Sequence, residues 1–149
     1  QEVHRVLQLR HPLTTLTHLF EESREDDIAT LLRSLKNADA VVLAVYLSIG
    51  SWKGKLELSP RLTDFLRKIS KLRKPIITVA FGDPYAIARL PETNVVMTSY
   101  AGHGRAERSV AAALVGDIHI KGKLPVTISG KYAIGEGLDL HAHTSTMDR

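Results

Sequence analysis

The sequence predicts an α/β domain, a three-layer sandwich in which helices cover both faces of a mostly parallel sheet. Short apolar runs rich in β-branched residues alternate with longer segments whose apolar residues recur at helical spacing. The clearest run, 76–81, is apolar almost throughout, which is typical of a strand buried on both faces. Gly82-Asp83-Pro84 follows it, and Asp83 suits the N-cap of a helix that begins at Pro84.

Size and composition favour one domain over residues 1–149. The chain has 149 residues, of which 44% are apolar, so a packed core can form. It has no cysteine, which excludes disulfides and thiolate metal sites. No apolar run has the length of a membrane span, and no signal peptide is visible. Because the first residue is Gln, we expect a mature fragment or an excised domain, and the compartment stays open.

The N-terminal segment is expected to begin with a strand. Residues 3–9 place Val and Leu among polar residues, and His11-Pro12 closes the run. Residues 13–22 are interpreted as a loop or a weak helix.

Two helices and a strand are predicted next. Ser23 and Asp26 resemble a capping box, and the helix that they begin ends near Asn37. Ala40–Tyr46 is a second buried strand, and a loop follows it. Ser59-Pro60 then starts a helix with an apolar stripe.

The last third is predicted to hold a third strand at 94–98 and a helix opened by Gly102-His103-Gly104. Ile118–Ile128 contains Gly122 and Pro125, so we expect an edge strand or an irregular one. Residues 139–149 are expected to form a frayed tail.

Three loops should meet at the carboxyl edge of the sheet: 46–55, 81–85 and 99–105. Their aromatic and hydrogen-bonding side chains would suit a sugar ring, and an anion could bind where a helix begins. The candidate ligand-binding residues are Trp52, Asp83, Tyr85, His103 and Arg105, with Tyr46 and Tyr100 beside them.

Each candidate also has a structural interpretation. Trp52 could pack at a domain contact, Asp83 could serve only as a cap, and the His103 and Arg105 side chains could simply be exposed. The basic stretch 51–74 could bind a polyanion or form the solvated face of a helix.

No catalytic constellation is recognisable. The chain lacks a P-loop, a dinucleotide fingerprint and a nucleophile elbow, and no pair of carboxylates is placed for glycoside hydrolysis. No His pair has metal spacing on a helix, and His141 and His143 are expected to be solvated. We therefore expect no catalytic residue, no metal and no cofactor.

Several motifs occur together in a familiar order. They are Ala38–Ala44, Lys74–Tyr85, Gly122–Ile128 and Tyr132–Leu138. Together they resemble the C-terminal α/β sandwich domain of glycoside hydrolase family 3, and most of all its bacterial β-N-acetylhexosaminidase branch. The resemblance extends over about Ser23 to Leu138, and residues 1–22 match poorly.

The resemblance implies a two-domain enzyme. In that family a (β/α)8 barrel precedes this domain and carries the aspartate nucleophile, while the second domain helps to wall the sugar site. The glucosidase branches take a glutamate acid/base from a loop that corresponds to 51–54 here, where no carboxylate occurs. The hexosaminidase branch takes its proton donor from a His-Asp pair in the barrel.

The expected role follows from that family. The whole enzyme would hydrolyse terminal N-acetylglucosamine with retention, and this chain alone would be inactive. Its partners would be the barrel of the same polypeptide and the glycan, with no nucleic acid. A leading strand-helix unit is expected to be missing, so the isolated chain would expose a sheet edge and self-associate.

Two other functions stay open on the sequence. The chain could be a stand-alone module that binds carbohydrate through Trp52 or a polyanion through the basic helix. It could also be a flavodoxin-like or nucleotide-binding domain with a phosphate site at 102–105.

Overall fold

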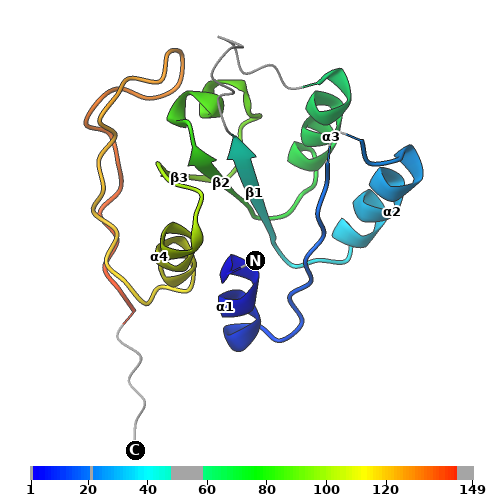
Figure 1. Ribbon diagram of the computed structural model, residues 1–149, viewed down its shortest axis with the longest axis horizontal. Coiled ribbons are helices and arrows are strands. Elements are labelled where there is room, and N and C mark those ends of the chain that lie inside the picture. Colours follow the sequence, from blue (N-terminus) through cyan, green and yellow to red (C-terminus); the bar gives the residue numbers. More distant parts are fainter. Residues whose placement is uncertain (1, 21, 48–58, 144–149) are drawn as a thin grey trace, which may run out of the picture. The chain divides into compact units, whose positions relative to one another are not determined.

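The fold is seen in a computed structural model that describes residues 2–20, 22–47 and 59–143 (Figure 1). In this part of the chain three parallel strands alternate with helices, which confirms the predicted α/β class. None of the described helices combines the length and the apolar character that crossing a membrane requires.

The sheet has the order β1-β2-β3, with β1 at Val41–Leu47, β2 at Ile76–Gly82 and β3 at Val95–Ser99. The central strand β2 is the most buried. Its neighbours Val79 and Ala80 point to opposite faces of the sheet and are both 0% exposed. The prediction of a strand buried on both faces is therefore confirmed.

Helices α2 (Glu25–Leu35) and α3 (Pro60–Ser70) pack with one face of this sheet. The buried residues of this core are Val41, Phe65, Leu66, Ile69, Ile76 and Leu90. The start of α3 is as predicted, because the Ser59 hydroxyl accepts a hydrogen bond from the Leu62 backbone N–H at 3.3 Å.

The start of α2 lies later than predicted. The Arg24 backbone N–H donates to the Asp27 carboxylate at 3.3 Å, and Arg24 is the N-cap. Ser23 instead accepts a hydrogen bond from the Phe20 backbone N–H at 2.9 Å, so it stabilises the preceding turn. The capping pattern in the sequence therefore located the helix but not its first residue.

The first element is a helix, α1 (Glu2–Arg10), so the strand predicted at 3–9 is wrong. The side chains of Val3, Val6 and Leu7 are at least partly buried, and their spacing places them on one helical face. Helix α1 packs against α4 (Gly104–Leu114). This distant contact gives the short amphipathic segment a partner, and that partner decides its conformation.

Residues 117–143 form a long irregular hairpin that we call the arm. Ile120 and Leu140 exchange two backbone hydrogen bonds of 2.9 and 2.8 Å, and Ile128 and Tyr132 exchange two of 2.8 and 3.0 Å. The bridges are isolated, which agrees with the expected irregular strand. The two segments most specific to the family resemblance, 122–128 and 132–138, face each other in this hairpin.

The first residues of the expected tail, 139–143, are described and make backbone hydrogen bonds. Leu140 is bonded to Ile120, and the His143 backbone N–H donates to the Gly116 carbonyl at 2.8 Å. Residues 139–143 are therefore held by the arm, and 144–149 lie outside the described residues.

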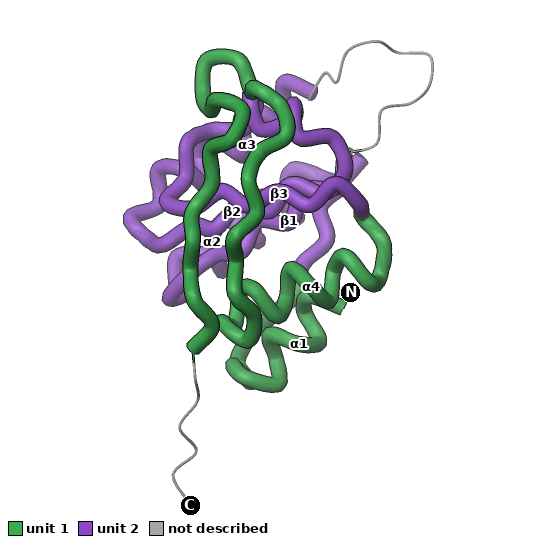
Figure 2. Tube along the Cα trace, turned by 90° about the vertical axis from the view of Figure 1, so that its left-hand side faces the viewer, with its two compact units in different colours: residues 1–16, 102–149 green, residues 17–101 purple. Residues whose placement is uncertain are grey.

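The chain forms two compact units, coloured separately in Figure 2. One contains residues 17–101, with the sheet, α2, α3 and the short helix η1 (Pro84–Arg89). The other contains residues 1–16 and 102–149, with α1, α4 and the arm.

Candidate functional site at the carboxyl edge of the sheet

The strand ends of the sheet unit, residues 17–101, form one continuous edge. Leu47 pairs with Gly82 at the ends of β1 and β2, and Phe81 pairs with Ser99 at the end of β3. Helices α2 and α3 begin on the side to which the strand arrows point (Figure 1). The three strands, α2, α3 and the short helix η1 therefore contribute residues to this edge, where α/β sheets usually bind ligands.

Three tyrosines lie at this edge, one after or near the end of each strand. Tyr46, Tyr85 and Tyr100 are 48%, 52% and 50% exposed. Burial raises the pKa of Tyr100 above its usual 10.0. Half-exposed tyrosine rings offer an apolar face and a hydroxyl group together, which suits both sugar binding and domain contacts.

The Tyr46 ring has a rigid support that the sequence analysis missed. Its centroid lies 4.5 Å from that of Phe81, and the ring planes differ by 7°. Phe81 is 1% exposed, so it fixes the inner face of Tyr46 while the outer part stays accessible. The sequence shows only that Phe81 ends the apolar run 76–81; its pairing with Tyr46 follows from the register of β1 and β2.

Asp83 has the capping role that the sequence allowed. Its carboxylate accepts a hydrogen bond from the Tyr85 backbone N–H at 2.9 Å. Gly82 before it has φ +96°, a value that favours glycine. The two residues turn the chain sharply out of β2, and this turn places Tyr85 at the surface.

Arg61 in the first turn of α3 was also missed. Its Nε and Nη2 atoms are buried and have no hydrogen-bond partner among the described residues. Its charge contributes to lowering the pKa of Asp27, after the larger effect of the hydrogen bond from Arg24. Buried N–H groups that lack an acceptor are unfavourable, so these two nitrogens favour an acceptor group close to the start of α3.

His103 and Arg105 belong to the other unit, where they begin α4. His103 is the N-cap and makes no capping hydrogen bond through its side chain, and both residues are exposed. Glu107 is in the same helical turn and accepts a hydrogen bond from the Glu2 backbone N–H at 2.9 Å. A carboxylate therefore already occupies the first turn, which weakens the case for an anion site.

The structure thus brings together some of the predicted residues. Asp83 and Tyr85 share one turn at the edge that Tyr46 and Tyr100 also line. Trp52 lies outside the described residues. The predicted meeting of all three loops stays a prediction.

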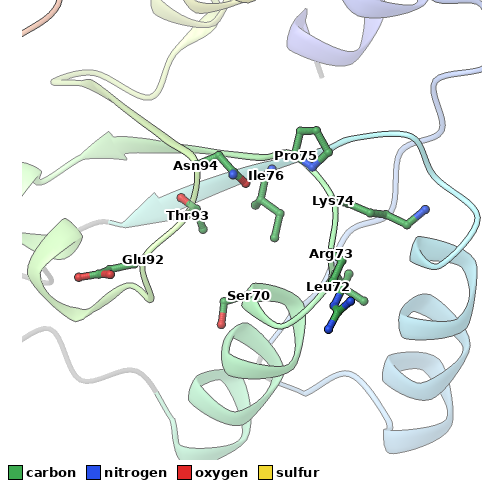
Figure 3. Close-up of a pocket in the computed structure, with 9 residues that line it drawn as sticks. All are labelled: Ser70, Leu72, Arg73, Lys74, Pro75, Ile76, Glu92, Thr93 and Asn94. Atoms are coloured by element: carbon green, nitrogen blue, oxygen red, sulfur yellow. Dashed lines mark hydrogen bonds between the residues drawn. The ribbon is translucent and has the colours of Figure 1, made fainter.

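A hollow of about 510 Å³ lies at the opposite, amino end of the strands (Figure 3). Several of its polar side chains make structural hydrogen bonds: Asn94 accepts from the Ile76 backbone N–H at 2.9 Å, and the Thr93 hydroxyl bonds that of Thr78 at 2.9 Å. The Lys74 ammonium donates to the Ala38 carbonyl. Because these groups fix the ends of the strands, we interpret them as structural and not as ligand-binding groups.

The basic face of α3 is partly neutralised. Asp64 forms ion pairs with Lys68 at 2.7 Å and with Arg67 at 3.8 Å. The hydrogen bond from Lys68 lowers the pKa of Asp64, so the carboxylate keeps its charge to a lower pH than an ordinary aspartate. This arrangement fits a solvated helix face better than a polyanion site.

Comparison with known proteins establishes the family. The model of the glycosyl hydrolase family 3 C-terminal domain matches residues 3–145. The chain therefore belongs to this family of α/β domains. The match begins at residue 3, so it includes most of the segment 1–22 that the motifs had left outside the resemblance.

A solved structure has a similar fold. It was described as a unique GCN5-related glucosamine N-acetyltransferase region in the fungal multi-domain GH3 β-N-acetylglucosaminidase. The TM-score is 0.69 at 20% identity, over 87% of this chain and 14% of the fungal one. This chain thus spans about a seventh of that protein, and the likeness shows the fold alone. No curated protein matches the sequence.

Proposed function

We propose that this chain is the non-catalytic second domain of a family 3 glycoside hydrolase that releases terminal N-acetylglucosamine, as the bacterial β-N-acetylhexosaminidase branch does. Membership of the C-terminal domain family is the observation that carries the proposal. The fungal protein with a similar fold is named a β-N-acetylglucosaminidase, which supports the choice of sugar.

In this proposal the carboxyl edge completes a sugar site on a catalytic barrel. Tyr46, Tyr85 and Tyr100 would contact the barrel rim or the glycan, and Arg61 would receive an acidic or polar group from the barrel. Trp52, His103 and Arg105 stay candidates for the same rim.

An assay of the isolated chain with a chromogenic N-acetylglucosaminide tests the absence of catalysis. We expect no hydrolysis above the buffer rate, because the nucleophile is expected on the barrel. Turnover that is abolished by a substitution within the chain would overturn the proposal.

The reading frame upstream of Gln1 provides the second test. A region that encodes a barrel would support the two-domain enzyme. A frame that begins at this domain, together with tight binding of free chito-oligosaccharides lost in Tyr85→Ala, would favour a stand-alone carbohydrate-binding module instead.

A further inference from the structure

Three potential metal ligands lie together on the arm: His119, Asp139 and His141. One donor atom from each lies within 4.8 Å of the other two. We propose that this cluster binds a divalent transition-metal ion, with Zn²⁺ as the physiological candidate. The proposal does not depend on the function proposed above.

The backbone pairing of the arm produces this arrangement. Ile120 and Leu140 exchange both hydrogen bonds, so His119 and His141 on either side form a non-hydrogen-bonded pair, the type with the closer side chains. Their ring centroids are 4.4 Å apart. Asp139 is two residues from His141, and in an extended strand that spacing places both side chains on the same face.

The donor set suits the ion. Two imidazole nitrogens and one carboxylate oxygen are a common set of protein ligands for zinc, with a fourth position left to water. Imidazole also suits Ni²⁺ and Cu²⁺, whereas Mg²⁺ and Ca²⁺ prefer sites made of oxygen ligands. The chain has no cysteine that could compete for a soft metal.

The geometry requires only a small adjustment. Bonds of about 2.0–2.1 Å place tetrahedral donor atoms about 3.4 Å apart, and the donor atoms here lie within 4.8 Å of one another, so no pair must approach by more than about 1.4 Å. Side chains of His119 and Asp139 are 37% and 61% exposed, and are therefore able to rotate. The hydrogen bond between them already turns the His119 ring toward the carboxylate, and the ion would replace the proton that they share.

One nearby charge opposes binding. Lys121 is the residue opposite Asp139 in the register set by Ile120 and Leu140, so it shares the face of the cluster. Its ammonium repels a divalent ion, although solvent screens the effect. We therefore expect the site to accept metal more readily in Lys121→Gln than in the wild-type chain.

Metal binding would cross-link the two strands of the arm at the end away from its turn at 128–132. The ion would thus add a fixed point where the hairpin has only isolated bridges. It would also give His141, expected from the sequence to be solvated, a structural role.

Isothermal titration of the chelator-treated 149-residue chain with ZnCl₂ tests the proposal. We expect one equivalent of Zn²⁺ to bind. His119→Ala and His141→Ala should each weaken binding at least about tenfold, the lower limit seen when even an outer-shell partner of a metal is removed. Circular dichroism of each variant checks that the fold is retained.

His143→Ala is the matched control, because it removes an imidazole from the same strand two residues from His141 and leaves the cluster intact. Its affinity for Zn²⁺ should equal that of the wild type. Titration with Co²⁺ should also produce the visible absorption of a four-coordinate ion, lost in His141→Ala. Absence of Zn²⁺ binding, or an equal loss in His143→Ala, would overturn the assignment.

Discussion

Asn94 shows how one side chain sets the start of the central strand. Ile76 is the first residue of β2 and is 2% exposed, so its backbone N–H needs a partner inside the protein. The Asn94 side-chain carbonyl provides it at 2.9 Å, from the turn that precedes β3. A polar residue that lines a hollow thus has a structural task.

We predict that Asn94→Ala lowers the free energy of unfolding by about 1–3 kcal/mol, because a buried donor loses its acceptor. Asn94→Asp keeps an acceptor oxygen at the same place and should lose less than half as much. Urea unfolding followed by circular dichroism measures both values. Equal losses in the two variants would show that the hydrogen bond to Ile76 is unimportant.

At the carboxyl edge of the sheet, the sequence identified some of the site residues and missed others. Asp83 and Tyr85 were identified because a strand ends directly before them, and both lie at the predicted edge. Arg61 was not identified, because the burial of its Nε and Nη2 atoms depends on the folded structure around them. A local sequence pattern can place a residue at the edge of a sheet, but it does not show whether atoms of its side chain are buried there.

The arm contains two glycines, Gly130 and Gly137, that are required for different structural reasons. Gly137 has φ +159°, and a Cβ atom there would lie closer than 3.0 Å to the Gly122 carbonyl oxygen. Gly130 has φ +77° and open space where its Cβ would be. One position is limited by the facing strand and by its backbone angle, the other by its backbone angle alone.

Gly130→Ala should therefore cost about 1–2 kcal/mol of stability, the penalty for a left-handed residue. Gly137→Ala should cost about 1–3 kcal/mol more, because the methyl group also pushes the strands apart. Thermal and urea denaturation of both variants measure the difference. A Gly137→Ala protein no less stable than Gly130→Ala would contradict the tight pairing of the arm.

At the scale of the whole molecule, the sheet of the described residues ends on an apolar edge strand. Strand β1 lies at one end of the order β1-β2-β3 among the described residues, and its sequence is VVLAVYL. An edge strand of this kind can pair with a second chain. The self-association expected from the sequence thus has a specific surface, and it stays a prediction.

Ala44 in β1 is exposed, so Ala44→Lys places a charge on this edge. We predict that the wild-type chain self-associates with increasing concentration and that Ala44→Lys reduces this, because the ammonium opposes pairing of two edges. Ala29→Lys on the exposed side of α2 adds the same charge elsewhere and should behave as the wild type. Sedimentation velocity measures all three, and a monomeric wild type would refute the prediction.

The sequence by itself determined the three strands of the sheet, the helix starts at Ser59 and Asp83, and the α/β class. These depend on signals within a few residues of each other: β-branched runs, capping side chains and prolines at first helical positions. The family could also be identified, because its motifs occur in order along the chain.

Only the tertiary structure decided three other features. Helix α1 needed α4 as a packing partner, the arm needed its register, and the approach of His119 to Asp139 and His141 followed from that register. The packing of α1 on α4, the outer bridge from Ile120 to Leu140 and the approach of His119 to Asp139 all join residues about twenty or more positions apart. Such contacts form only when the whole chain is folded, so no local pattern could reveal them.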